Sequence, residues 1–361
     1  MKLRIFCILF ISLLFFSAFS CTNYSSKSRK PIIKITLSPH KKNIFTGDSV
    51  SISVSVKLKN GEPDKAELFL DNELVKTTNE TAFNFPVNRL NNPGKHQIKV
   101  VATKKDGTEG INFYSFEVLS DIQPEMLSYE IIKTYPHNTD HFTQGLEIHN
   151  DEFYESTGEN GKSFIYRFDL NTGKVLQSVK LNDKYFGEGI SIMNDKIYQL
   201  TYKAQKGFIY NLNTFAKVDS FSYETQEGWG LTHNNRYLIK TDGSEFLHFI
   251  DPSTMQVVKK IPVYDHKGPV KNLNELEYAD GYIYANIWTT SYAVKIDPET
   301  GKVLSKIDFS GLLSVMYHPE KPVDVLNGIA INQENGKIYI TGKLWPKLFE
   351  VKLVKKGQDL H

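Results

Sequence analysis

The sequence predicts an all-β protein in which an N-terminal immunoglobulin-like β-sandwich is followed by a five-bladed β-propeller. Short runs of alternating apolar and polar residues, separated by turn signals, fill residues 31–121. From about residue 125 to residue 361, five related segments, most of them containing glycine, recur at intervals of 41 to 53 residues. This spacing is typical of four-stranded propeller blades.

The first segment of the chain has the pattern of an export signal. Lys2 and Arg4 precede an apolar run over residues 5–16 that is short for a membrane span, and small residues then lead to Cys21. We expect residues 1–20 to be a signal peptide and Cys21 to be lipidated, with plain secretion as the alternative. Residues 21–30 are expected to form a flexible tether to a bacterial membrane, facing the periplasm or the cell surface.

Composition excludes several functions. Lys plus Arg, 43 residues, nearly balance Asp plus Glu, 41 residues, so no large positive field is available for nucleic acid. Both cysteines, Cys7 and Cys21, lie in the export segment, so the body of the protein has no disulfide or thiolate metal site. We expect a monomer without a cofactor.

Alternating runs in residues 31–121 account for the predicted sandwich. Asn60-Gly61 and Asp106-Gly107 mark turns between them. No cluster of ionisable residues marks a site, so we expect this domain to act as a spacer or a weak partner contact. The predicted strands are 33–37, 50–58, 66–70, 98–102 and 113–119.

The propeller prediction depends on five related openings. Each is followed by aromatic-rich strands, and several units close in a turn such as Asp297-Pro298-Glu299-Thr300-Gly301, which lacks the further carboxylates of a Ca²⁺ loop. Pairing of residues 128–134 with residues 349–354 would close the ring and hide both edges. The openings are Thr143-Gln144-Gly145-Leu146, Gly187-Glu188-Gly189-Ile190, Gly228-Trp229-Gly230-Leu231, Leu273-Asn274-Glu275-Leu276 and Leu326-Asn327-Gly328-Ile329.

The second residue of each opening is expected to face the central channel, because the innermost strand of every blade lines that channel. A carboxylate, three amides and an indole at equivalent positions indicate a site rather than simple packing. Neighbouring positions add aromatic and acidic side chains, as in a ligand pocket. The ring residues are Gln144, Glu188, Trp229, Asn274 and Asn327, and their neighbours are Phe142, Phe186, Glu227 and Glu275.

A series of five motifs resembles the glutaminyl-peptide cyclotransferases of the plant and bacterial type, over about residues 125–354. The resemblance implies a five-bladed propeller that releases ammonia from N-terminal glutamine of peptides or proteins and leaves pyroglutamate. The motifs are Phe142-Thr143-Gln144-Gly145-Leu146, Phe186-Gly187-Glu188-Gly189, Glu227-Gly228-Trp229-Gly230-Leu231, Asn274-Glu275-Leu276-Glu277 and Thr341-Gly342-Lys343-Leu344-Trp345.

Residue roles follow from this resemblance and from the chemistry of cyclisation. Glu188, between glycines that would let the substrate approach, is expected to carry the proton from the α-amine to the leaving nitrogen. Gln144 and Asn274 would bind the γ-carbonyl or orient the amine, and Glu275 would hold the arriving ammonium group. Lys343 would bind a peptide carbonyl or polarise the amide. The remaining substrate-binding residues are expected to be Phe142, Phe186, Glu227, Trp229, Trp288, Asn327 and Trp345.

Other functions remain as alternatives. His137 and His141 are spaced by four residues, but their segment resembles a loop, so we interpret them as scattered structural histidines. A non-catalytic propeller that binds ligands at the cell surface is the main alternative. A metal-dependent propeller hydrolase would want several carboxylates in the channel, whereas the ring position holds the single carboxylate Glu188.

Overall fold

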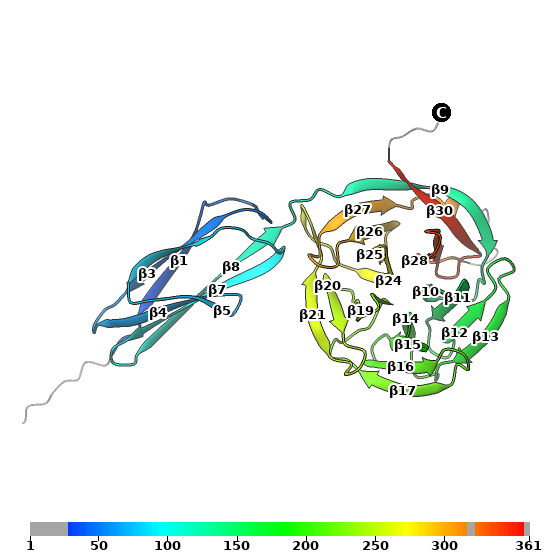
Figure 1. Ribbon diagram of the computed structural model, residues 1–361, viewed down its shortest axis with the longest axis horizontal. Helices are drawn as coiled ribbons and strands as arrows, with labels where there is room; N and C mark the ends of the chain where they lie inside the picture. Colours follow the sequence, from blue (N-terminus) through cyan, green and yellow to red (C-terminus); the bar gives the residue numbers. More distant parts are fainter. Residues whose placement is uncertain (1–27, 316–321, 357–361) are drawn as a thin grey trace, which may run out of the picture.

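The computed structural model describes residues 28–315 and 322–356, and Figure 1 shows its two parts. The predicted signal peptide and Cys21 lie outside the described residues. Within the described ranges no helix is long and apolar enough to cross a membrane. The helix found there is the single turn α1 (Leu312–Val315), so the protein is all-β, as predicted.

The first part of the molecule is a sandwich of two sheets. Its core consists of the inward-facing side chains of both sheets, and the burial of β1 alternates strictly along the strand, which explains the alternating sequence. One sheet has the order β1-β3-β6 and the other the order β2-β8-β7-β4-β5. The strands are β1 (Ile32–Ser38), β2 (Ile44–Phe45), β3 (Val50–Lys57), β4 (Pro63–Leu70), β5 (Glu73–Thr78), β6 (Ala82–Val87), β7 (Gly94–Lys104) and β8 (Glu109–Leu119).

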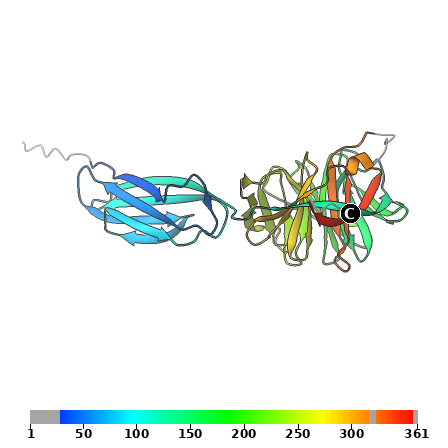
Figure 2. The ribbon, with the colours of Figure 1, turned by 90° about the horizontal axis from the view of Figure 1, so that it is seen from above.

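The sandwich lies beside the second part of the molecule, so that the two follow one another along its length in both views (Figures 1 and 2). The hydroxyl of Tyr264 donates to Oε1 of Glu117 at 2.9 Å. Nζ of Lys302 lies 2.7 Å from Oδ1 of Asp121. These polar contacts are made at the junction, far from the ends of the sandwich strands that face away from it.

Three four-stranded antiparallel sheets make up most of the second part. Each is built in chain order from the inside to the outside of a ring (Figure 1). The first contains β10 (Thr143–His149), β11 (Glu152–Thr157), β12 (Phe164–Phe168) and β13 (Val175–Lys180); the second β14 (Gly187–Met193), β15 (Lys196–Thr201), β16 (Lys206–Asn211) and β17 (Lys217–Ser222); the third β18 (Leu231–His233), β19 (Leu238–Lys240), β20 (Phe246–Ile250) and β21 (Val257–Pro262).

An eight-stranded sheet completes the ring. Its order is β24-β25-β26-β27-β9-β30-β29-β28, so the early strand β9 lies between two late strands. β9 pairs in parallel with β27 and antiparallel with β30. The strands are β9 (Glu125–Pro136), β24 (Leu273–Ala279), β25 (Tyr282–Ile287), β26 (Tyr292–Ile296), β27 (Val303–Asp308), β28 (Leu326–Ile331), β29 (Ile338–Gly342) and β30 (Lys347–Lys355); β22 (Tyr264–Asp265) and β23 (Gly268–Pro269) form a separate small hairpin.

The predicted closure of the ring is confirmed. Ser128 pairs with Val354 and Thr134 pairs with Phe349, as the spare strand before the first opening required. This pairing removes the exposed edges that both strands would otherwise present. The predicted hairpin turns are also present, with Gly173 and Gly301 at φ values of 66° and 74°.

Five inner strands meet around the axis of the ring. β10, β14, β18, β24 and β28 contact one another in this order, and β28 returns to β10. Their starts carry the five sequence openings, so residues far apart in the chain come together at one end of the channel. The described fold is propeller-like.

Candidate active site

A cavity of about 270 Å³ opens at the ends where the inner strands start. Eight of the twelve predicted site residues line it, and four lining residues were not predicted. The cavity is lined by Phe142, Gln144, Phe186, Glu188, Tyr202, Trp229, Asn274, Trp288, Thr289, Asp324, Val325 and Lys343.

Glu188 is the buried carboxylate of this cavity. It is the second residue of β14 and is only 4% exposed. Nε2 of Gln144 donates to its Oε1 at 3.2 Å. Burial raises the pKa of Glu188 well above its ordinary value; the positive charge of Lys343 opposes this rise and the negative charge of Glu227 adds to it. A carboxyl group with a raised pKa takes up a proton more readily than an exposed one, as an acid/base group must.

Gln144 and Asn274 place amide groups beside this carboxylate. Asn327 donates from Nδ2 to Oε1 of Gln144 at 3.2 Å and to the Thr143 carbonyl at 2.9 Å, which orients the Gln144 amide toward Glu188. Among the described residues no group donates to the buried Oδ1 of Asn274. A buried acceptor without a partner costs free energy, so Asn274 offers a place for an N–H group of a ligand.

Aromatic side chains form the walls. The rings of Trp229 and Trp288 meet edge to face with centroids 5.3 Å apart, and those of Phe142 and Phe186 do so at 6.1 Å. Nε1 of Trp229 donates to Oε2 of Glu227 at 2.9 Å, which fixes the indole. The walls exclude water and lower the local dielectric, which is the physical cause of the raised pKa of Glu188.

Lys343 supplies the positive charge of the cavity. It follows the end of β29 and is 5% exposed. Its Nζ lies 4.7 Å from the ring centroid of Phe142. Burial lowers the pKa of Lys343, while the negative charges of Glu188 and Asp324 oppose this. A buried ammonium group and a buried carboxyl group thus share one pocket and influence each other.

The glycines around Glu188 serve packing between sheets, which corrects the expectation that they admit the substrate. A Cβ atom at Gly189 would lie 2.4 Å from the backbone nitrogen of Leu231 on the next inner strand. A Cβ atom at Gly187 would lie 2.6 Å from the carbonyl of Thr157. The backbone of a neighbouring sheet approaches each glycine so closely that a larger residue would not fit at either position.

Four predicted site residues lie outside the cavity lining. Glu275 does not face an arriving ammonium group: its carboxylate accepts backbone N–H groups from Leu146 at 3.2 Å and Ile329 at 2.8 Å. Trp345 is 1% exposed and donates to the Asp324 carbonyl. Glu227 and Asn327 act behind the cavity, on Trp229 and Gln144. Equivalent repeat positions therefore do not have equivalent roles.

Four residues that line the cavity were not predicted from the sequence: Tyr202, Thr289, Asp324 and Val325. Each follows or precedes a strand in a connecting segment, where the repeat sets no fixed spacing. Tyr202 comes directly after β15, and its ring packs against that of Phe186 at 5.7 Å. In the sequence, the one indication of their role is that these connecting segments lie at the same end of the ring as the openings.

A second and larger cavity, about 600 Å³, lies where the inner strands end. Glu147 and Glu277 line it, and both are buried. Together with Glu275 they give the channel three buried carboxylates besides Glu188, which is the single carboxylate at the ring position. These carboxylates are not among the side chains whose ligand atoms lie close enough to hold a metal ion. Among the described residues, the group that meets this condition lies in another part of the protein.

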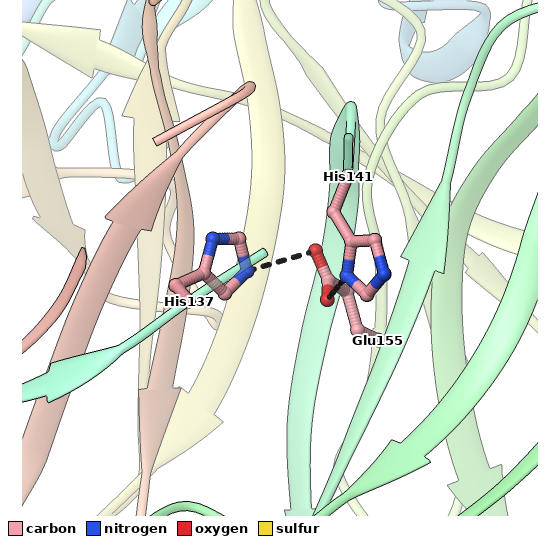
Figure 3. A group of neighbouring side chains, drawn as sticks. All are labelled: His137, His141 and Glu155. Carbon is pink, nitrogen blue, oxygen red and sulfur yellow. Dashed lines mark hydrogen bonds and ion pairs between the residues drawn. The ribbon is translucent and has the colours of Figure 1, made fainter. Parts of the chain in front are cut away.

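That compact group contains the two histidines that we interpreted as scattered. His137 and His141 lie in the loop after β9, as predicted, but both contact the buried carboxylate of Glu155 (Figure 3). The ligand atoms of the three side chains lie within 4.8 Å of one another. The prediction of unrelated histidines is therefore wrong, because the loop folds back over β11.

The fold and the cavity together define a propeller-like protein with a buried carboxyl group in a cavity at one end of its channel. A sequence model described as glutamine cyclotransferase matches residues 108–353, and one described as bacterial Ig domain matches residues 31–100. The chain belongs to the glutamine cyclotransferase family.

Two relatives illustrate this membership. The chain is 37% identical over 235 residues to a glutaminyl-peptide cyclotransferase of Arabidopsis thaliana, covering 64% of this chain and 73% of the relative. The crystal structure of Myxococcus xanthus glutaminyl cyclase matches with 38% identity and a TM-score of 0.60, covering 64% of this chain and 98% of that one. Most of the sandwich lies outside the family match, which begins at residue 108.

Proposed function

We propose that this protein converts N-terminal glutamine of peptides and proteins into pyroglutamate with release of ammonia, and that Glu188 is its acid/base catalyst. The observation that carries the proposal is the environment of Glu188. It is buried, the side-chain amide of Gln144 is its one hydrogen-bond donor among the described residues, and it faces a cavity with aromatic walls. Membership of the glutamine cyclotransferase family supports the same reaction.

The reaction needs one proton carrier. The neutral α-amine of the substrate attacks its own γ-amide carbon, and Glu188 accepts the proton that the nitrogen loses. The same carboxyl group then donates this proton to the amide nitrogen, whose bond to carbon breaks as ammonia leaves. The new N–C bond closes the lactam ring, and Glu188 returns to its carboxylate form.

Charge develops on the γ-carbonyl oxygen during this attack. Lys343 is placed to stabilise that oxygen, because its buried ammonium group lies in the same cavity as Glu188. Asn274 is placed to accept a hydrogen bond from the α-amine, because its Oδ1 has no donor among the described residues. With these two contacts the amine and the amide carbon are held beside Glu188.

The aromatic walls are proposed to hold the methylene groups of the glutamine side chain. Trp229 is fixed by Glu227, whereas Trp288 is 38% exposed and lies at the mouth. The rest of a peptide substrate leaves through this open side, past Tyr202 and Asp324. A non-catalytic binding module is not favoured, because a simple ligand contact gives no reason for a buried carboxyl group and a buried ammonium group in one pocket.

The organisation of the whole chain is also a proposal. The five contacting inner strands support five blades, the eight-stranded sheet being two blades joined by β9. We assign residues 31–121 to the sandwich and residues 125–361 to the catalytic domain. We further propose a monomer that is exported and held to a membrane by lipid on Cys21; metabolic labelling of wild type and Cys21→Ser with a fatty acid tests the anchor.

Ammonia release tests the reaction. A peptide that starts with glutamine should release ammonia and lose the corresponding mass, both with and without a chelator. The same peptide with an acetylated α-amine should stay unchanged, because the nucleophile is blocked. Binding of the peptide without ammonia release would instead favour the binding module, and loss of activity with chelator would indicate a metal-dependent reaction.

A further inference from the structure

The cluster of His137, His141 and Glu155 lies behind the catalytic cavity and does not line it. His137 follows β9, His141 precedes β10, and Glu155 lies on β11. Figure 3 shows the two imidazoles on either side of the carboxylate. Nδ1 of His141 is 2.6 Å from Oε2 of Glu155, and Nε2 of His137 is 3.2 Å from Oε1. The side chains of His137, His141 and Glu155 are 2%, 5% and 0% exposed.

This cluster joins two segments that carry residues of the cavity. His137 contacts the turn after β29 twice, through Nδ1 to the Trp345 carbonyl at 2.7 Å and through its backbone N–H to the Pro346 carbonyl at 3.0 Å. The carbonyl of His141 accepts the backbone N–H of Leu344 at 2.8 Å. Lys343 directly precedes the three residues contacted, Leu344 to Pro346. The cluster therefore fixes the position of the turn that carries Lys343.

The other segment is held from the same carboxylate. Oγ1 of Thr143 donates to Oε1 of Glu155 at 2.7 Å, and it also lies 3.4 Å from the Gly342 carbonyl. Phe142 and Gln144 flank Thr143 in the chain, and both line the cavity. One buried carboxylate therefore ties together the segment with Phe142 and Gln144 and the turn with Lys343.

The hydrogen-bond pattern also fixes charge. Both ring nitrogens of His137 face acceptors, the Trp345 carbonyl and the Glu155 carboxylate, and this arrangement favours the doubly protonated imidazolium form. Burial alone would lower the pKa of His137, but the negative charge of Glu155 raises it above its ordinary value. Burial would raise the pKa of Glu155, but the two imidazoles hold it well below its ordinary range. Removing one member leaves the other charge buried without its partner.

A metal ion is the competing explanation, since two imidazoles and a carboxylate are common zinc ligands. Two ligand atoms of one tetrahedral zinc ion lie about 3.3 Å apart for bonds of about 2.0–2.1 Å. The 2.6 Å separation between His141 and Glu155 is shorter than this and matches a charge-assisted hydrogen bond. Oε1 of Glu155 is moreover shared by Thr143 and His137. The geometry therefore favours a closed hydrogen-bonded network.

We propose that His137, His141 and Glu155 form a positioning unit that fixes Lys343 relative to Phe142, Gln144 and Glu188 in the catalytic cavity. The three residues do not touch the substrate; they act through the two segments that they hold. The proposal rests on the proposed function for its kinetic consequences only. Its structural consequence is measurable in any case, because the positive charge of Lys343 lowers the pKa of Glu188 and this effect depends on the distance between the two groups.

Glu155→Gln is the main test. It keeps the side-chain volume and one oxygen acceptor but removes the charge. We expect kcat to fall about 10- to 100-fold with a smaller change in KM, the cost expected when a reacting group is displaced by about 1 Å. We also expect the titration of the Glu188 carboxyl carbon, followed by ¹³C NMR and assigned with Glu188→Gln, to move to higher pH, because Lys343 no longer stabilises the carboxylate form. A destabilised fold alone would not produce this shift.

Glu152→Gln is the matched control. Glu152 lies on the same strand, but its carboxylate pairs with Arg167 outside the cluster. Its kcat and its Glu188 titration should equal those of the wild type. If Glu155→Gln does not fold, His141→Asn and His137→Gln replace it, because the amide nitrogen of each stands where the ring nitrogen donated to Glu155. Both variants remove an imidazole that stabilises the Glu155 carboxylate and should show the Glu188 shift in a smaller measure.

Three results would overturn the proposal. The first is an unchanged Glu188 titration and an unchanged kcat in Glu155→Gln or in both histidine variants. The second is a loss of kcat that only follows the loss of folded protein. The third is one metal ion per purified chain that disappears in Glu155→Gln. If the wild type itself releases no ammonia, the proposed function fails, and the NMR titration still decides the positioning role.

Discussion

The two ends of the central channel both contain buried glutamates, but these glutamates are bound in different ways. At the end where the inner strands finish, Glu147 accepts the backbone N–H of Ile192 with both oxygens, at 3.0 and 2.9 Å. Glu277 accepts the backbone N–H of Ile331 at 3.1 Å. At the other end Glu188 accepts no backbone N–H among the described residues and receives a side-chain amide instead. Glu188 therefore has oxygen lone pairs free for a substrate.

Burial and a raised pKa do not distinguish Glu188 from the other glutamates of the channel. Burial raises the pKa of Glu147 to about 8 and that of Glu275 to about 8, although backbone N–H groups oppose the rise in both. Burial raises the pKa of Glu277 and Glu188 well above the ordinary value as well. A perturbed pKa is therefore a poor guide to catalysis in this channel. What distinguishes Glu188 is a cavity with a donor, an acceptor and aromatic walls around a carboxylate that the backbone does not use.

Glu188→Gln should have the largest effect on activity. The amide keeps the shape of the side chain but cannot exchange a proton at neutral pH. We expect kcat to fall about 10²- to 10⁴-fold. The thermal midpoint should stay near that of the wild type, because no backbone N–H loses its acceptor. Steady-state ammonia release and circular dichroism measure the two quantities; a variant that is inactive because it is unfolded would fail this prediction.

Lys343→Met should have the next largest effect. The loss of a preorganised charge should lower kcat/KM about 10- to 100-fold. Because Lys343 lowers the pKa of Glu188, its removal raises that pKa further. Glu188 is needed as a carboxylate, so activity is lost as the pH falls through its pKa, and the acidic limb of the kcat/KM profile should move to higher pH. A limb that stays in place would place Lys343 outside the electrostatic reach of Glu188.

Glu275→Gln should change stability rather than catalysis. One of the two backbone N–H groups that Glu275 accepts loses its acceptor, which costs about 1–3 kcal/mol in the free energy of unfolding. Denaturant unfolding at low pH, compared with the wild type, measures this difference. A stability equal to that of the wild type would contradict the structural role of Glu275.

The pH dependence of wild-type stability should reflect the same carboxyl group. The folded-state pKa of Glu275, about 8, lies above the ordinary value of 4.5. Its contribution to stability is therefore fully present below pH 4.5 and is lost as the pH rises toward 8. Unfolding curves across this range should show a larger decline for the wild type than for Glu275→Gln. Parallel curves would show that Glu275 does not titrate differently in the folded state.

Trp288→Ala should have the smallest effect. Trp288 stands at the mouth of the cavity and is 38% exposed, so truncation removes part of one wall and leaves Glu188 in place. We expect KM to rise about three- to tenfold, corresponding to about 1 kcal/mol of lost apolar contact, with kcat nearly unchanged. Initial rates over a range of peptide concentrations separate the two parameters. A fall in kcat alone would mean that the indole orients the reacting groups.

The repeat explains what could be predicted from the sequence. Residues at one repeat position must meet around the axis, and Gln144, Glu188, Trp229 and Asn274 do meet in one cavity. The repeat says nothing about side-chain direction in detail, so Asn327, at the same position, was placed with the substrate although it binds Gln144. The repeat position of a residue therefore predicts which residues lie near it. It does not predict which of their side chains face the cavity.

Connecting segments account for most of what could not be predicted. Tyr202 and Asp324 reach the cavity from segments whose length differs between repeats. In the sequence Glu155 looks like an ordinary strand residue. Its contacts with His137 and His141 exist only in the folded protein, where the loop with the two histidines packs over it. Glu275 and Glu277 alternate on one inner strand, and only the neighbouring strands show that their carboxylates accept backbone N–H groups. The roles of these residues depend on contacts between segments that are distant in the sequence, so they could not be predicted from it.

The most direct test compares two glutamate variants from the same channel. The rate of pyroglutamate formation from a peptide that starts with glutamine is measured for Glu188→Gln and Glu275→Gln, each divided by the amount of folded protein. We predict that Glu275→Gln keeps most of the wild-type rate while Glu188→Gln loses nearly all of it. Equal losses in the two variants, or a Glu188→Gln protein that works at the wild-type rate, would contradict it.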